Sequence, residues 1–190
     1  MNSGLQYRAL PWLFLLAISR CCVSTPSPPP KSLMDSFVPD AYQGKWFVEL
    51  YTVKPIQELR GCLTYTIAIS ESSKKSKTVV NYVTLSNTRK DIRLTMTADE
   101  DQIGVYVVPM GASRMFEVVV LDTDYETYNV LWLRAGQNEQ KHESIVVSSR
   151  TPGSWKKQKS KIEASLERAG VNTKIDEMGV IDNEAACAIQ

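Results

Sequence analysis

Apolar and polar residues alternate along most of the chain between positions 44 and 149, which is the pattern of half-buried β-strands. Turn-forming segments such as SNTRKD and DTDYET interrupt the alternation at short intervals. Because most of these connections are short, we expect consecutive strands to pair antiparallel. The pattern predicts eight strands, over Gly44–Val53, Cys62–Ser70, Thr78–Leu85, Ile92–Thr97, Gly104–Val108, Met115–Leu121, Tyr128–Ala135 and Glu143–Ser149.

The period of the pattern changes after the eighth strand. Over Ser154–Ala169 the apolar side chains recur at helical spacing and charged residues occupy the other positions, which predicts an amphipathic helix. Gly170 suits the position that ends a helix. Beyond it the sequence predicts a short strand over Lys174–Ile181 and a tail that carries Cys187.

These elements predict an all-β fold: an eight-stranded antiparallel up-and-down β-barrel with one C-terminal α-helix packed outside. Closing the sheet removes exposed strand edges, and eight strands leave an interior that can hold one small ligand. A β-sandwich is the alternative on alternation alone, but it would not explain a helix placed after the eighth strand.

Residues 1–24 have the composition of a secretory signal peptide. Arg8 precedes the apolar run Ala9–Ser19, and small residues follow it. The run is shorter than the roughly 20 residues that a membrane span needs; a buried N-terminal helix is the alternative. Residues 25–36 are proline-rich and predict a flexible lead-in. We therefore expect a secreted, extracellular protein without a membrane span.

Loss of the leader would change both the charge and the cysteine count. It would remove Arg8 and Arg20 and leave 20 basic and 21 acidic residues without a basic patch, so we expect no nucleic-acid partner. Two cysteines would remain, and in an oxidising compartment they predict one disulfide, Cys62–Cys187. The single histidine excludes a site built from several histidines, and we expect no metal.

Three separated segments should meet at one end of such a barrel: GKW, TDYETY and SSRTP, at residues 44–46, 123–128 and 148–152. We expect Trp46 to point inward and close that end, and Gly44 to let another backbone approach. Arg150 would then lie across the indole ring in a cation–π contact. Asp124 would either hold Arg150 or accept hydrogen bonds from nearby amides.

This combination resembles the lipocalins over nearly the whole chain from about residue 37, so residues 37–190 are expected to form a lipocalin domain. The similarity is greatest to the insect bilin-binding proteins and insecticyanins, the crustacyanins and apolipoprotein D, and the segments VVNYVTL and NEAAC add to it. Those relatives carry a further cysteine pair that this chain lacks. The motif residues that the resemblance assigns a structural role are Gly44, Trp46, Thr123, Asp124, Tyr125 and Arg150.

Alternation from Trp46 and Arg150, together with matching to these relatives, predicts the residues that face the interior and bind ligand. They are Val48, Asn81, Val83, Leu85, Ile92, Leu94, Met96, Phe116, Val118, Val120, Leu131, Leu133, His142, Ser144 and Val146. The fifth strand could turn either Val105 and Val107 or Tyr106 and Val108 inward. The wall is apolar with few polar points, namely Asn81, Ser144 and His142, and it suits a flat or elongated ligand whose polar end stays near the open mouth. A core filled by side chains is the alternative.

The resemblance implies a secreted carrier of a small hydrophobic ligand, with a non-covalently bound bilin-type pigment favoured over a retinoid, carotenoid, fatty acid or sterol. It implies that the protein is not an enzyme and requires no cofactor. Two alternatives stay open: a protein whose open-end loops bind a partner such as a receptor or protease, and a lipocalin-type isomerase. A homo-oligomer is also open. The isomerase would need a free thiol, whereas Cys62 and Cys187 are expected to be bonded to each other.

Overall fold

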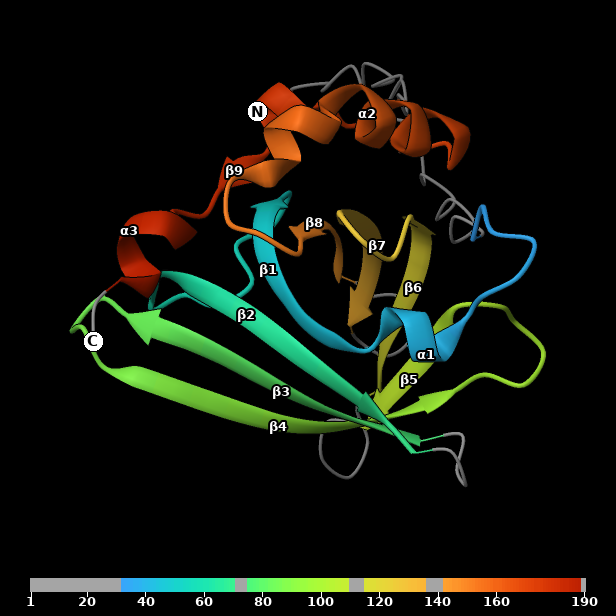
Figure 1. Ribbon diagram of the computed structural model, residues 1–190, viewed down its shortest axis with the longest axis horizontal. Coiled ribbons are helices and arrows are strands. Elements are labelled where there is room, and N and C mark those ends of the chain that lie inside the picture. The colour runs from blue at the N-terminus through green and yellow to red at the C-terminus, as the bar shows by residue number, and fades with distance from the viewer. Residues whose placement is uncertain (1–31, 71–74, 110–114, 136–141, 189–190) are drawn as a thin grey trace, which may run out of the picture.

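The computed structural model describes residues 32–70, 75–109, 115–135 and 142–188, and it is a closed antiparallel β-barrel (Figure 1). The expected leader and the start of the lead-in lie outside these residues. The eight barrel strands are β1 Gly44–Tyr51, β2 Leu59–Ile69, β3 Lys75–Thr84, β4 Arg89–Ala98, β5 Val105–Pro109, β6 Met115–Thr123, β7 Tyr128–Ala135 and β8 His142–Ser149.

Each strand pairs antiparallel with the next along the chain, and β1 closes the barrel by pairing with both β2 and β8. A short extra strand, β9 Gly179–Val180, pairs with β1 at Leu50 and Tyr51, beyond the part of β1 that pairs with β2. The predicted up-and-down barrel is therefore confirmed. The β4–β5 pairing is the shortest in the barrel, with Thr97 opposite Val107 and Ala98 opposite Tyr106.

The barrel has two apolar cores, one inside it and one between its wall and the helix α2 (Lys159–Arg168). Successive residues of β6 alternate between them: Val118 and Val120 face the interior, and Val119 and Leu121 face outward under the helix. This explains why the segment is a continuous apolar run rather than an alternating one. Full burial of each large side chain stabilises the fold by about 1.5–3 kcal/mol.

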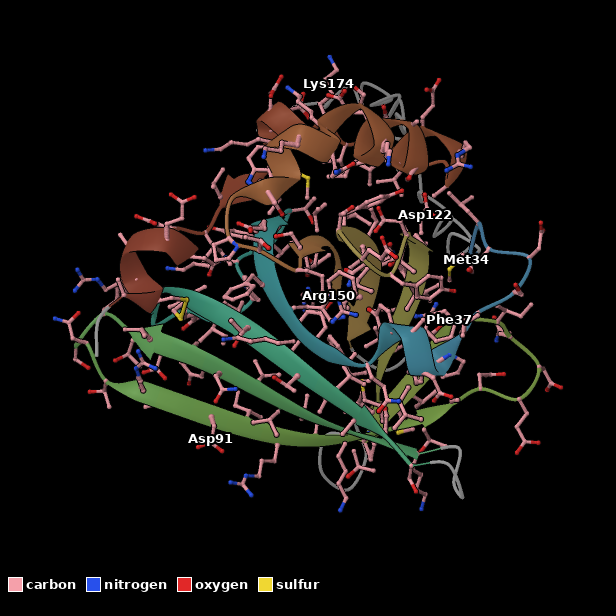
Figure 2. All side chains as sticks on the ribbon, in the orientation of Figure 1. Met34, Phe37, Asp91, Asp122, Arg150 and Lys174 are labelled. Carbon is pink, nitrogen blue, oxygen red and sulfur yellow. A yellow bond between two sulfur atoms is a disulfide. The ribbon has the colours of Figure 1, made fainter. Side chains whose placement is uncertain are left out.

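The helix covers the outer face of β6–β8, as predicted (Figure 1). Its first turn, η1 Ser154–Gln158, is 3₁₀, and the α-helix then runs over Lys159–Arg168. Asp122 at the end of β6 faces this helix and accepts hydrogen bonds from the Ser165 hydroxyl, from Tyr128 Oη at 3.1 Å and from Arg168 Nη2 at 3.0 Å (Figure 2).

The predicted strand over Lys174–Ile181 is wrong for most of its length. The structure has a 3₁₀ turn, η2 Ile175–Glu177, followed by the two-residue strand β9. Ile175 and Met178 are spaced three apart and are both buried in the outer core, and a single turn of 3₁₀ helix brings both to that face.

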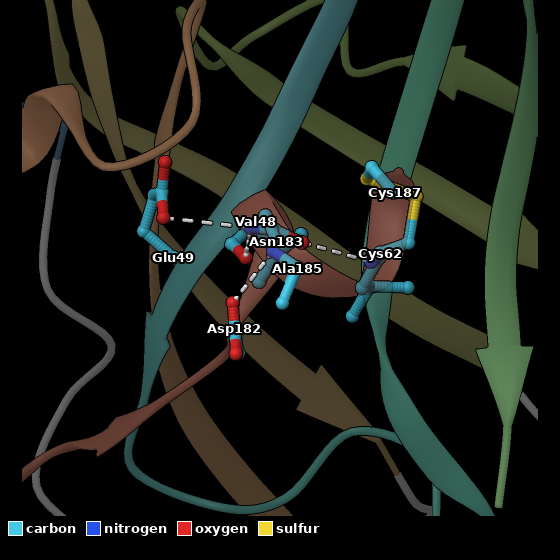
Figure 3. The surroundings of a disulfide bond; sticks show 8 residues. Val48, Glu49, Cys62, Asp182, Asn183, Ala185 and Cys187 are labelled. Atoms are coloured by element: carbon cyan, nitrogen blue, oxygen red, sulfur yellow. Dashed lines mark hydrogen bonds between the residues drawn. A yellow bond between two sulfur atoms is a disulfide. The ribbon is translucent and has the colours of Figure 1, made fainter. Parts of the chain in front are cut away.

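The end of the chain is fixed to the barrel by a disulfide and by one asparagine (Figure 3). Cys62 of β2 forms the predicted disulfide with Cys187, which ends the short helix α3 (Asn183–Cys187). Their Cα atoms are 4.7 Å apart. The Asn183 side chain accepts from Leu63 N at 3.0 Å and donates to Val48 O at 2.6 Å. The segment thus spans β1 and β2.

Candidate functional site

The closed end of the barrel is built around Trp46, which is fully buried. The guanidinium carbon of Arg150 lies 3.7 Å from the centre of the indole ring, and Trp46 Nε1 donates to Tyr42 O at 3.1 Å. Gly44 has φ +94°, and a Cβ there would lie 3.2 Å from Arg150 Nη1. A side chain at position 44 would therefore be strained and would also crowd the cation.

Arg150 binds two segments that are distant from it in sequence, residues 41–45 and the loop at Tyr125. Its Nε donates to Tyr125 O at 3.0 Å, Nη1 to Lys45 O at 3.1 Å and Nη2 to Ala41 O at 3.2 Å. The planar, forked guanidinium can make these bonds while stacking on the indole ring, which a lysine could not do.

The loop between β6 and β7 is held by its own side chains. Asp124 accepts from the backbone amides of Glu126, Thr127 and Tyr128 at 3.2, 2.7 and 3.1 Å, and from the Thr127 hydroxyl. Of the two roles expected for Asp124, the geometry therefore supports amide capping. Burial acts to raise the pKa of Asp124, but these hydrogen bonds together outweigh it and the pKa is lowered. Thr123 Oγ1 donates to Tyr128 O at 2.9 Å.

Above the tryptophan, a buried hydrogen-bonded group forms the floor of the interior. Asn129 Nδ2 donates to Tyr65 Oη at 2.8 Å and to Tyr42 Oη at 3.2 Å. Tyr42 belongs to the short helix α1 (Pro39–Tyr42), which covers this end. Burial is the largest cause that raises the pKa of both tyrosines, so both hydroxyls stay protonated at neutral pH.

The barrel encloses a cavity of about 210 Å³ between this floor and the open mouth. Its wall is almost wholly apolar, and no charged residue is among the described side chains that line it. Ten residues that the sequence placed in the interior line this cavity: Val48, Ile92, Leu94, Met96, Phe116, Val118, Val120, Leu131, Leu133 and Val146. The interior is therefore not completely filled by side chains.

The orientation predicted for β3 was shifted by one residue. Thr78 and Val80 line the cavity, whereas Asn81 is exposed, Val83 is buried outside the cavity lining, and Leu85 lies beyond the strand, 66% exposed. Shifting a strand by one residue exchanges its two faces. Both faces of VVNYVT carry apolar side chains, so alternation alone could not correct the register that the resemblance implied.

The two residues expected at the start of β8 do not line the cavity. His142 is exposed. Ser144 lies at the rim, where its hydroxyl meets Thr52 Oγ1 and the Val53 amide, each at 3.3 Å. The segment after β1 thus covers this side of the rim, which the alternation of β8 by itself could not show.

The sequence analysis missed several residues that line the cavity. In β5, whose register was left open, Tyr106 faces inward and burial is the largest cause that raises its pKa to about 12. In β2, the alternating residues Leu63, Tyr65 and Ile67 face the cavity, and their spacing in the sequence is the signal that could have predicted this. The lining residues that were not predicted are Tyr42, Pro55, Ile56, Leu63, Tyr65, Ile67, Thr78 and Val80.

Two other kinds of feature, a metal site and a membrane-spanning helix, are absent from the described ranges. No group of three or more His, Cys, Asp or Glu side chains is placed to hold a metal ion in the part of the chain that the structure describes. Among the same residues, no helix is long and apolar enough to cross a membrane.

An eight-stranded up-and-down barrel of this topology, closed at one end and with a cavity inside, has the shape of a calyx. No protein-family model matches the chain, and no curated protein sequence matches it. Solved structures do. Insecticyanin from the tobacco hornworm Manduca sexta superposes with a TM-score of 0.66 at 16% identity, covering 85% of this chain and 88% of that one.

Two further solved structures have the same fold. Lobster apocrustacyanin A1 gives a TM-score of 0.61 at 17% identity, covering 75% of this chain and 77% of its own. The tryptamine complex of the amine-binding protein of Rhodnius prolixus gives 0.61 at 21% identity, covering 82% and 87%. These proteins are lipocalins, and at such identities the agreement establishes that this chain has the lipocalin fold.

Proposed function

We propose that the protein is a secreted carrier that binds a small, predominantly apolar molecule in the barrel cavity. The observation that carries this proposal is the enclosed apolar cavity of about 210 Å³, closed at one end by the buried Trp46. Burial of apolar ligand surface supplies most of the binding free energy in a pocket of this kind. The Cys62–Cys187 disulfide supports an oxidising, extracellular location.

Binding without chemistry is favoured over catalysis. Cys62 and Cys187 are bonded to each other, so neither offers a thiolate. His142 is exposed at the start of β8 and does not line the cavity. The hydroxyls that do line it belong to tyrosines and one threonine, and their task there is hydrogen bonding.

The cavity also bears on which ligand is bound. The Rhodnius prolixus protein was solved with tryptamine, whose amine is cationic, but no carboxylate is among the described residues that line this cavity. A bilin-type pigment is the class that the sequence resemblance favours. At about 210 Å³ the cavity is smaller than the ~300–1,000 Å³ pockets that enclose drug-sized ligands, so a bilin would extend through the mouth. Retinoids, carotenoids, fatty acids and sterols are the other candidates.

Two neighbouring residues of β4 provide a test of cavity binding. Leu94 lines the cavity, whereas Arg93 is exposed on the outer face. Leu94→Trp should fill the cavity and abolish the fluorescence enhancement of N-phenyl-1-naphthylamine, a neutral apolar dye, while Arg93→Trp should leave it unchanged. If both variants or neither lose dye binding, the cavity is not the site. Visible absorbance and mass spectrometry of the molecule extracted from natural protein would then identify the ligand, and a colourless complex would exclude a bilin.

A further inference from the structure

The hydrogen-bonding groups of the cavity lie at its closed end. The β-strands run between a closed end, where β1 and β3 begin, and an open mouth, where β2 and β4 begin. The hydroxyl-bearing residues that line the cavity are Tyr42, Tyr65, Thr78 and Tyr106. Tyr42 lies in the helix that covers the closed end, Tyr106 begins β5 there, and Thr78 is opposite Ile67 near the closed-end terminus of β2.

The cavity lining near the mouth is apolar by contrast. The residues of the lining that lie nearest to it are Pro55, Ile56, Ile92, Phe116 and Leu133. Asn81, His142 and Ser144, the three polar side chains that were expected to meet the ligand near the mouth, do not line the cavity. The polarity of the binding site is therefore the reverse of the one expected from the sequence.

Thr78 is the side chain best placed to bind a ligand group. It lines the cavity, is 4% exposed, and its Oγ1 has no hydrogen-bond partner among the described residues. A buried hydroxyl without a partner is unfavourable, and a ligand group that pairs with it removes that cost. A threonine hydroxyl can donate to a carbonyl or accept from another hydroxyl.

The hydrogen-bonded floor at the closed end also has an unsatisfied group. Asn129 is fully buried, and its Oδ1 has no partner within the described residues, although Nδ2 bonds both Tyr42 and Tyr65. Turning the amide over would exchange its two atoms and leave the nitrogen without a partner instead. Either way, one polar atom of Asn129 remains unpaired, although Asn129 itself does not line the cavity.

We propose that the ligand is an amphiphile with one uncharged hydroxyl or carbonyl group, which enters the barrel polar end first and pairs with Thr78. This inference rests on the proposed carrier function and specifies its ligand class. A charged end group is disfavoured because none of the described lining residues is charged, and burying an unpaired ion is costly. The apolar body of the ligand then fills the mouth half of the cavity.

Two probes that differ only in a hydroxyl test this orientation: naphthalene and 2-naphthol, the latter uncharged at neutral pH. We expect the wild-type protein to bind 2-naphthol roughly tenfold more tightly than naphthalene. Thr78→Val is close in shape and removes the hydroxyl, so it should remove that preference by weakening 2-naphthol alone. The control is Thr66→Val, an exposed position on β2, which should leave both affinities unchanged.

The other outcomes separate the two proposals. If Thr78→Val leaves the ratio of the two affinities unchanged, or weakens both probes equally, the polar-end-first orientation is wrong while a carrier function stands. If the wild-type protein binds neither probe, and also does not bind the apolar dye, the carrier function itself is overturned. Thermal unfolding of each variant shows whether a loss of binding reflects a loss of fold.

Discussion

The two ends of the barrel are built in different ways. At the closed end Trp46 is fully buried, and Arg150 stacks on it while donating to three backbone carbonyls. At the mouth the large apolar side chains are open to solvent, with Ile92 41% and Leu85 66% exposed. The ion pair there, Lys90 with Glu58 at 2.9 Å, is about half exposed on both sides.

This difference indicates that the closed end contributes most to stability, whereas the mouth provides access for a ligand. An exposed ion pair contributes about 0–1 kcal/mol, whereas a buried aromatic side chain contributes several. Substitutions at the closed end should therefore change the free energy of unfolding, and substitutions at the mouth should change binding with little effect on unfolding. The following predictions test that separation, beginning with the largest effect.

Replacing Trp46 by Ala should lower the free energy of unfolding by about 3–5 kcal/mol, because it leaves a cavity in the closed end and removes the surface on which Arg150 stacks. Leu85→Ala, at the mouth, should change it by less than about 0.5 kcal/mol because the side chain is already solvated. Urea unfolding of both variants measures the difference. Similar losses would mean that the two ends are not energetically distinct.

Removing the disulfide should lower the free energy of unfolding by about 2–4 kcal/mol. The bridge joins residues 125 positions apart, so its loss frees a long loop in the unfolded chain. The disulfide lies outside the barrel, toward the mouth end of β2. Its removal therefore tests whether a covalent link outside the barrel stabilises the mouth end. The double variant Cys62→Ser/Cys187→Ser avoids a lone thiol. We expect its dye affinity to equal that of wild type; a large loss of affinity would show that the bridge shapes the cavity.

Arg150→Met should cost about 2 kcal/mol, since it removes the cation–π contact and three hydrogen bonds while retaining an apolar stem. Arg150→Lys should recover less than half of the loss, because an ammonium lacks the planar fork. Denaturant midpoints of the two variants provide the comparison. Full recovery in the lysine variant would mean that charge alone, rather than the forked geometry, stabilises this end.

Much of the closed end could be predicted from the sequence because its parts are short local motifs. Gly44, Trp46 and Arg150 each lie at a strand terminus, and the barrel topology alone brings them together. The interior of β6 could also be predicted, since Val118 and Val120 alternate with residues that the helix covers.

The wall formed by β3 could not be predicted in the same way. Its two faces differ little in polarity, so a one-residue error in register moved Asn81 inward and Thr78 outward. The hydrogen-bonded floor was also missed. It depends on a hydrogen bond between Tyr42, in a four-residue helix, and Asn129, which is 87 residues further along the chain. The spacing of apolar residues does not predict such a long-range contact.

The smallest effect tests the pH dependence of the closed end through Asp124. Its pKa is lowered in the folded protein from the ordinary value of 3.8, because hydrogen bonds from Thr127, Tyr128 and Glu126 together outweigh the effect of burial. A carboxyl group with a lowered folded pKa contributes stability that is present above the unfolded pKa and is lost as the pH falls through the folded pKa. Asp124→Ala should thus cost about 1 kcal/mol at neutral pH, as loss of a capping side chain does. The deficit relative to wild type should shrink progressively below the ordinary value of 3.8.

The control for Asp124 is Asp91→Ala on β4, where the carboxylate points outward and pairs with the exposed Arg93 at 3.3 Å (Figure 2). This variant should differ from wild type by less than about 0.5 kcal/mol. Urea unfolding at a series of pH values gives both curves. If the loss of unfolding free energy in Asp124→Ala stayed constant into the acidic range, the charge of this carboxylate would not contribute to stability. The acid sensitivity of the closed end would then have another cause.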